Sequence, residues 1–188
     1  REDAMYKWVE FHKWKFKLAW YNELYDKLVL MTRVRFGYLG CYNQGIGITP
    51  FQRFYLGGDG LSNYNFDGRE IIGMRGYANN RLTPNFYIDE DFGGNIFTKY
   101  TLELRYPLSL NPTATIYALG FLEAGNDWFG VENFNPFDVY RSAGLGLRIY
   151  LPMFGMLGID WGYGFDDIPG VSGGNKSQFH FSIGGSID

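Results

Sequence analysis

Residues 94–106, Gly-Asn-Ile-Phe-Thr-Lys-Tyr-Thr-Leu-Glu-Leu-Arg-Tyr, decide the fold class of this chain. Apolar and polar side chains alternate along the stretch, which is typical of a β-strand with one greasy face and one polar face. The apolar face holds Ile96, Tyr100, Leu102, Leu104 and Tyr106, and the opposite face holds Asn95, Lys99, Thr101, Glu103 and Arg105. Such a strand suits a wall that separates lipid from water.

The composition favours a transmembrane β-barrel. Although 46% of the 188 residues are hydrophobic, the mean hydropathy is only -0.22, so apolar and polar residues are finely interleaved. The 15 Tyr and 17 Phe suit interfacial aromatic girdles, and the 26 Gly suit tight turns and close strand packing. No stretch approaches the roughly 20 apolar residues of a membrane helix. A soluble β-sandwich shares the strand signals and stays open as an alternative.

The alternation predicts seven antiparallel strands in an all-β fold. Their expected ranges are 6–21, 28–41, 94–106, 113–125, 139–151, 156–165 and a last strand after residue 176. A turn is expected at Asp26-Lys27, and Pro107 with Asn111-Pro112 is expected to end the third strand. Short and long connections alternate, as in outer-membrane barrels with short periplasmic turns and long extracellular loops. An odd strand number and the lack of a signal peptide predict a piece of a larger protein.

Charged residues are expected to face a wet lumen. The lumen-facing set is Lys99, Glu103, Arg105, Arg148 and Asp160. A run of lysines in the first strand falls on one strand face, which indicates a solvated inner face rather than a phosphate-binding patch. The net charge of -3 gives no indication of a nucleic-acid partner.

The connection over residues 42–93 is the main candidate for function. Connections longer than about 12–15 residues are uncommon and are often functional. This one is an extracellular loop by the alternation above, and it carries Met74-Arg75-Gly76-Tyr77. Glycine there permits a turn that pushes the arginine into a partner site. Further along, Phe121-Leu122-Glu123-Ala124-Gly125 places one carboxylate among small and apolar residues, so Glu123 is a candidate partner of Arg75.

These motifs resemble those of the BamA family of outer-membrane assembly factors. The matching segments are Met-Arg-Gly-Tyr at 74–77, Phe-Leu-Glu-Ala-Gly-Asn at 121–126, Arg-Ser-Ala-Gly-Leu-Gly-Leu-Arg at 141–148 and Phe-His-Phe-Ser-Ile-Gly at 179–184. The resemblance covers essentially the whole chain, residues 1–188. It implies about seven C-terminal strands of a 16-stranded barrel in the bacterial outer membrane, with the upstream strands and the soluble periplasmic domains absent.

The resemblance also implies a lock between the long loop and the barrel wall. In that family the loop folds into the barrel and its arginine pairs with an acidic residue of the lumen wall. Carried over, the lock comprises Arg75, Gly76 and Tyr77 of the loop with Glu123 and Gly125 of the wall. A bidentate guanidinium–carboxylate pair is expected, with partial rescue by a charge swap. The family usually has aspartate where this chain has Glu123, which adds one methylene.

The last strand is the second site that the resemblance implies. It is expected to pair weakly with the first strand of the barrel, leaving a lateral seam where client strands add by β-augmentation. The seam residues are Phe179, Phe181, Gly184 and Gly185. Glycine weakens a strand and permits a kink, which suits that role.

No catalytic constellation is present in the sequence. His12 and His180 lack metal-ligand spacing, and Cys41 has no evident base. We therefore expect no enzyme, no cofactor and no metal. The expected partners are unfolded outer-membrane protein clients, accessory lipoproteins of the assembly machinery and outer-membrane lipids. Two alternatives stay open: a related secretion pore that exports one protein, and a soluble carbohydrate-binding β-sandwich.

Overall fold

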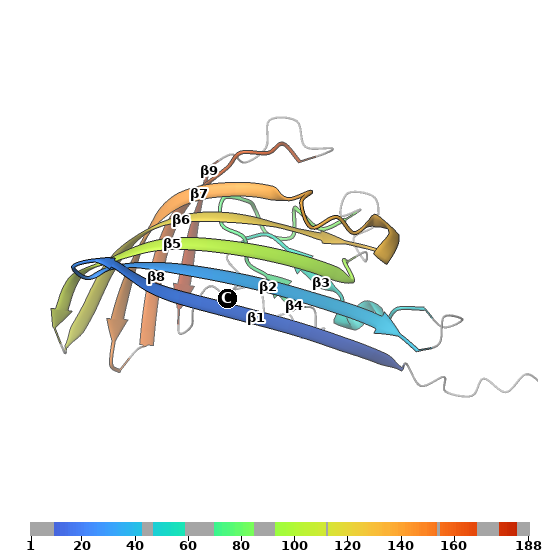
Figure 1. Cartoon of the computed structure of the whole chain (residues 1–188), viewed down its shortest axis with the longest axis horizontal. Coiled ribbons are helices and arrows are strands. Elements are labelled where there is room, and N and C mark those ends of the chain that lie inside the picture. Colours follow the sequence, from blue (N-terminus) through green and yellow to red (C-terminus); the bar gives the residue numbers. More distant parts are fainter. Residues whose placement is uncertain are drawn as a thin grey trace, which may run out of the picture.

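One curved sheet of seven antiparallel strands dominates the computed structural model (Figure 1). The structure describes residues 10–42, 47–58, 70–84, 93–111, 113–153, 155–168 and 177–183. The sheet order is β1-β2-β5-β6-β7-β8-β9. The strands are β1 (Phe11–Tyr25), β2 (Leu28–Cys41), β5 (Ile96–Asn111), β6 (Ala114–Trp128), β7 (Tyr140–Leu151), β8 (Gly155–Gly164) and β9 (Ser177–Ile183). The fold is all-β, and the described sheet is open.

The first hairpin is longer at its turn than the sequence predicts. Asp26 and Lys27 both have positive φ, 25° and 68°, as a two-residue hairpin turn requires. Because such a turn lets cross-strand pairing run up to its edge, β1 continues to Tyr25, where it pairs with Leu28. The predicted end at residue 21 was wrong, and the predicted start at residue 6 lies outside the described residues.

The prediction that Pro107 marks the end of the third strand was also wrong. Strand β5 passes through Pro107 and ends at Asn111. Its pairing with β6 shifts register between Pro107 and Ser109. Proline cannot donate to a ladder, and a β-bulge is one of the places where a strand accommodates that loss. Strand β5 therefore continues past the predicted end at residue 106.

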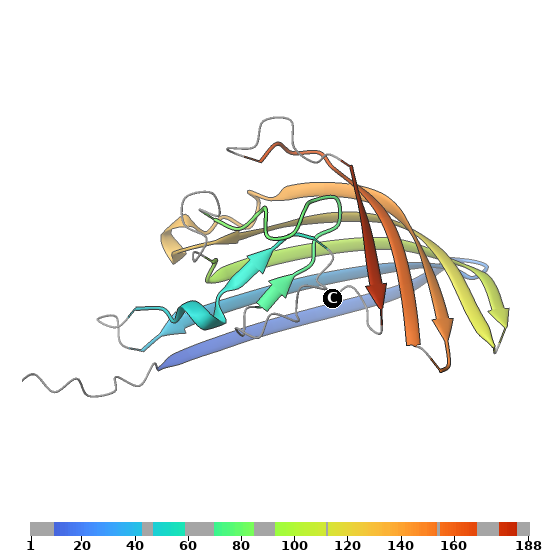
Figure 2. The same cartoon turned by 180° about the vertical axis from the view of Figure 1, so that it is seen from behind.

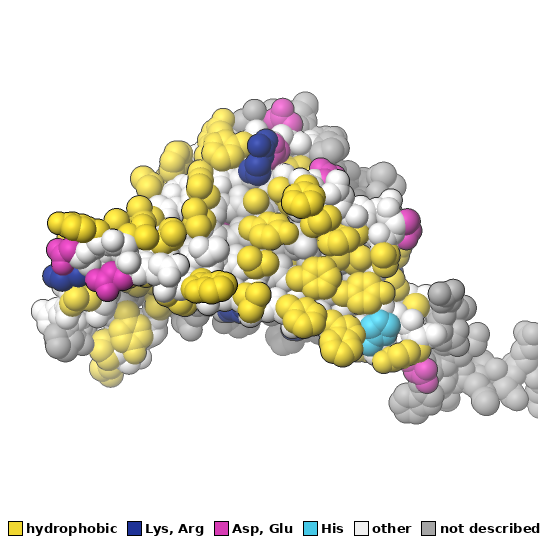
Figure 3. Space-filling view, in the orientation of Figure 1, with side chains coloured by type: hydrophobic (Ala, Val, Ile, Leu, Met, Phe, Trp, Pro, Cys, Tyr) yellow, Lys and Arg dark blue, Asp and Glu magenta, His cyan; other side chains and the backbone are white. Residues whose placement is uncertain are grey.

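The two faces of the sheet differ sharply. Along β5, Leu102, Leu104 and Tyr106 point outward and are 37–47% exposed, whereas Thr101 and Glu103 point inward and are 5% exposed. Hydrophobic side chains are spread over the outer face in Figure 3, between areas of backbone and other side chains. The described residues contain no helix that is long and apolar enough to cross a membrane.

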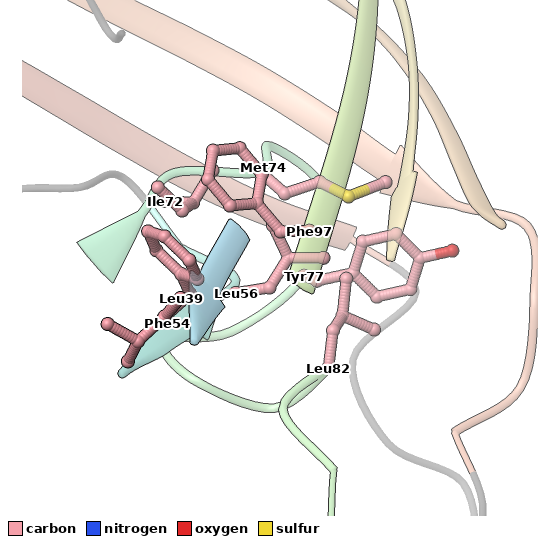
Figure 4. Close-up of a cluster of buried hydrophobic side chains, with 8 residues drawn as sticks. All are labelled: Leu39, Phe54, Leu56, Ile72, Met74, Tyr77, Leu82 and Phe97. Carbon is pink, nitrogen blue, oxygen red and sulfur yellow. The ribbon is translucent and has the colours of Figure 1, made fainter. Parts of the chain in front are cut away.

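The long connection packs against the inner face of the sheet. It contains a short 3-10 helix, η1 (Pro50–Gln52), and a parallel pair formed by β3 (Phe54–Leu56) and β4 (Glu70–Ile72). This pair lies on the concave side of the large sheet in Figure 2. An apolar core joins loop and sheet (Figure 4), made of Leu39, Phe54, Leu56, Ile72, Met74, Tyr77, Leu82 and Phe97. Where β2 and β5 contribute Leu39 and Phe97 to this core, the inner face of the sheet is packed against the loop instead of facing water.

Candidate functional site

The loop tip, residues 75–77, follows β4 and is placed by backbone hydrogen bonds. The Met74 N–H donates to the Gly58 carbonyl at 2.8 Å, and the Gly58 N–H donates to the Tyr77 carbonyl at 3.2 Å. Gly76 has a φ of 90°, a conformation that L side chains rarely adopt. A Cβ at Gly76 would also lie only 2.9–3.0 Å from atoms of β7 and β8. The tip therefore needs glycine both for its turn and for its contact with the sheet.

Arg75 is buried against carboxylates from three strands. Its side chain is 1% exposed. Nη2 donates to Glu103 Oε1 on β5 at 2.7 Å and to Glu123 Oε1 on β6 at 2.8 Å, and Nη1 donates to Asp160 Oδ1 on β8 at 3.4 Å. Nε also donates to Glu123 Oε1, and the backbone N–H of Arg75 donates to Glu123 Oε2 at 2.9 Å. The guanidinium lies 3.7 Å from the centroid of the Phe121 ring. Both oxygens of Glu123 are thus occupied by the loop tip.

Each of the three carboxylates also has a cation of its own on the inner face of the sheet. The pairs are Arg105 with Glu103, Lys99 with Glu123 at 3.0 Å, and Arg148 with Asp160 at 2.8 Å. A buried charge left without a partner is costly. Because these pairs do not include Arg75, no carboxylate becomes unpaired when the loop leaves. In the docked structure each carboxylate is therefore shared between Arg75 and a cation of the wall, an arrangement that suits a reversible lock.

The rest of the tip reaches the two remaining strands. The Gly76 N–H donates to His180 Nε2 on β9 at 2.9 Å. The Tyr77 hydroxyl donates to the Arg141 carbonyl on β7 at 2.7 Å and accepts from the Asp166 N–H at 3.3 Å. Together with the arginine contacts, three consecutive residues touch the five consecutive strands β5 to β9. The tip therefore acts as a staple across that part of the sheet.

Glycines in β8 make room for the tip. A Cβ added to Gly162 would lie 2.5 Å from the Gly76 nitrogen, and a Cβ added to Gly164 would lie 2.7 Å from the Tyr77 ring. Both distances are shorter than real Cβ contacts allow, and in the first case the obstacle is backbone. These alternate positions point inward, so β8 presents a shallow slot lined by backbone.

The environment of the site raises the pKa values of two tip residues. Burial acts to lower the pKa of Arg75, but the attraction of Glu123, Glu103 and Asp160 outweighs it and raises the pKa above its usual value. Arg75 therefore stays charged while buried. Burial also raises the pKa of Tyr77 to about 12, which keeps its hydroxyl protonated and able to donate.

The remaining predicted site residues lie around this centre. Gly125 lies on β6, where a Cβ would be 2.9 Å from the Thr98 carbonyl oxygen, so it marks close strand packing. Arg105 reaches the tip through Glu103, since both it and Arg75 bind that carboxylate. Phe179 and Phe181 point outward from β9, 67% and 56% exposed. The other two predicted seam residues, Gly184 and Gly185, lie outside the described residues.

Sequence reasoning missed how many groups meet the loop tip. It paired Arg75 with Glu123 and expected Lys99, Glu103 and Arg105 to line the cavity that receives the loop, but it named neither Glu103 nor Asp160 as a partner of Arg75. Both carboxylates lie at positions of their strands that point to the inner face, but the sequence does not show that they lie at the same level of the sheet. That information comes only from the pairing register of the strands. His180 was set aside because it lacked metal-ligand spacing, although it also lies on an inward-facing position. In the register of β8 and β9 it stands opposite Asp160.

The site offers hydrogen-bonding and ionic contacts rather than a metal centre. Among the residues that the structure describes, no group of three or more His, Cys, Asp or Glu side chains is arranged to hold a metal ion. These contacts can hold the loop tip at one place on the inner face of the sheet and can release it. The chemistry of the site therefore controls the position of the loop.

The fold and the site together define a class of protein. A curved antiparallel sheet with an apolar outer face and a loop bound to its inner face is consistent with part of the wall of a membrane β-barrel. Residues 3–187 match the Omp85 superfamily domain, so the chain belongs to the Omp85 superfamily. This superfamily is of outer-membrane β-barrel type, and its membership indicates a role in protein insertion or secretion. A comparison with curated proteins finds no match.

Proposed function

We propose that this chain is the C-terminal part of the barrel of a BamA-type assembly factor, which folds and inserts outer-membrane proteins. In this proposal the barrel has 16 strands, lies in the bacterial outer membrane and works without a cofactor or enzymatic step. Its partners are unfolded outer-membrane protein clients, accessory lipoproteins and membrane lipids.

The observation that carries the proposal is the docked arginine of the long loop. Arg75 lies 2.8 Å from Glu123 and 2.7 Å from Glu103, and both carboxylates keep a second cation. A lock whose carboxylates are shared with cations of the wall is suited to a protein that must rearrange in the membrane.

The client site of the proposal is the free edge of β9. This strand pairs with β8 on one side, and its other edge has no partner among the described strands. An unpaired edge presents backbone donors and acceptors on which another strand can add. The exposed Phe179 and Phe181 on its outer face suit contact with lipid beside that edge.

A secretion pore of the same superfamily is the second candidate, because the same loop would serve as a plug. The two candidates differ in the number of soluble domains that precede the barrel in the full-length protein: several favour assembly and about two favour secretion. The soluble carbohydrate-binding β-sandwich does not agree with the membership of the Omp85 superfamily.

Depletion of the full-length protein in its native cell tests the proposal. Outer-membrane protein levels are then measured by quantitative proteomics of isolated membranes. Assembly predicts a general loss of β-barrel proteins, and secretion predicts the loss of one exported protein with the barrels unchanged. Re-expression of the wild-type protein is the control, and a normal set of barrels after depletion would overturn the assembly role.

A further inference from the structure

The three-residue tip holds the five strands β5 to β9 through different groups. Arg75 binds β5, β6 and β8 through its charge, and Tyr77 binds β7 through its hydroxyl. The contact with β9 is of another kind, because the backbone N–H of Gly76 donates to the His180 side chain. The terminal strand therefore depends on one of its own side chains for this contact.

We propose that His180 is a positioning residue that ties the terminal strand to the docked loop tip, so that release of the tip loosens the strand at the seam. This inference rests on the proposed function, since it assigns the tie to the strand that borders the client site. It adds a contact through which docking or release of the loop changes how firmly that strand is held.

The chemistry of the contact requires a neutral acceptor. His180 is 3% exposed, and its Nε2 lies 2.9 Å from the Gly76 nitrogen. A nitrogen that accepts carries no proton, so the imidazole is neutral with its proton on Nδ1. The donor, the Gly76 N–H, is buried as well, and a buried N–H without an acceptor destabilises the state that buries it. A residue of similar shape without an acceptor cannot keep this tie.

Strand β9 is also the one for which an added tie matters most. Among the described strands it pairs with β8 alone, whereas β8 pairs with both β7 and β9. Local opening begins where few contacts resist it, and one neighbouring strand gives fewer contacts than two. His180 sits at the middle of the β8–β9 register, opposite Asp160. A tie at this position restrains the strand on both sides of its centre.

The arginine contacts make the proposal separable from the lock itself. Arg75 binds β5, β6 and β8 without His180, so a change at His180 leaves those contacts in place. We therefore expect variants at His180 to loosen β9 while the loop stays docked on the other strands.

Hydrogen exchange of the full-length protein in liposomes tests the tie, with mass spectrometry of peptides covering residues 177–183. His180→Leu keeps an apolar side chain but removes the acceptor, and we expect exchange in β9 to rise about tenfold. His180→Gln restores an acceptor of similar reach, and we expect exchange within about twofold of wild type. Peptides of the β5–β6 pair are the internal reference and are expected to stay unchanged.

Three results in the single variants would overturn the proposal. These are unchanged exchange in β9 of His180→Leu, equal acceleration in His180→Gln, and faster exchange in all strands together. In an Arg75→Met background, where the tip is released, His180→Leu is expected to add nothing, and full additivity would also contradict the tie. No client is present in this assay, so its result does not depend on the assembly role. The His180 tie can be refuted while the depletion experiment supports assembly, and it can be supported while that experiment does not.

Discussion

Replacing Arg75 by methionine should release the loop tip while the sheet stays folded. Methionine keeps an apolar side chain of similar length over the Phe121 ring but removes the charge and every side-chain donor. Four side-chain hydrogen bonds to Glu103, Glu123 and Asp160 disappear. The backbone N–H of residue 75 still reaches Glu123, so some affinity of the tip for the wall remains.

The expected magnitude follows from the hydrogen bonds that are lost. Hydrogen bonds to charged groups contribute about 1.5–3 kcal/mol each, and the guanidinium loses four of them. Because each carboxylate keeps its own wall cation, this loss falls on loop docking rather than on the stability of the sheet. At about 1.4 kcal/mol per factor of ten, the loss of even one such bond lowers the ratio of docked to released loop about 10- to 100-fold.

Hydrogen exchange over residues 70–84 of the full-length protein in liposomes measures this ratio. Arg141→Met is the matched control, since Arg141 is an exposed arginine that pairs with Asp166 and meets the tip through its backbone carbonyl. The control should exchange like wild type in this segment. Two results would refute the reasoning: wild-type protection of residues 70–84 in Arg75→Met, or collapse of the whole sheet in thermal unfolding.

Three further changes test other parts of the site. Gly162→Ala should displace the tip, because its Cβ would lie 2.5 Å from tip backbone, whereas Gly120→Ala meets nothing closer than 3.7 Å and should be silent; equal exchange over residues 70–84 in both would contradict the backbone slot. Asp160→Asn should lower the thermal unfolding temperature, because it breaks the buried pair with Arg148 at about 3–5 kcal/mol, and an unchanged transition would count against that pair. Tyr77 has a pKa raised to about 12 from about 10, so its contribution to docking is full below pH 10 and lost as the pH rises through 12; Tyr77→Phe should lack that step in loop exchange and weaken docking by about 0.5–1.5 kcal/mol, and a step that persists in the variant would argue against it.

The charge swap that the sequence suggested is a poor test in this structure. Glutamate at position 75 would face Glu103 and Asp160, and arginine at position 123 would face Lys99. Like charges at these distances repel, so both single reversals and the swap should fail to dock the loop. The expected rescue considered only the charges of Arg75 and Glu123.

Much of the wall could be predicted from local sequence. Alternation with period two is a property of neighbouring residues, and it located all seven strands of the large sheet. The errors fell where a local signal competes with pairing, as at Pro107, where a register shift lets β5 continue to Asn111. The inward apolar Phe97 breaks the polar pattern of that face, and its reason is the loop core that packs on it.

The sequence by itself determined the strand pattern, the outward greasy face and the presence of an arginine in a long loop. It also pointed to Glu123 as a partner of that arginine, and only the tertiary structure added Glu103, Asp160 and the contacts of Gly76 and Tyr77. The partners of Arg75 lie 28, 48 and 85 residues away along the chain, and Gly76 and its acceptor His180 are 104 residues apart. Which inward residues share one level of the wall depends on cross-strand register, a non-local quantity that a period-two pattern leaves free. The strands of residues 94–106 and of Glu123 therefore became one site only when the loop docked across them.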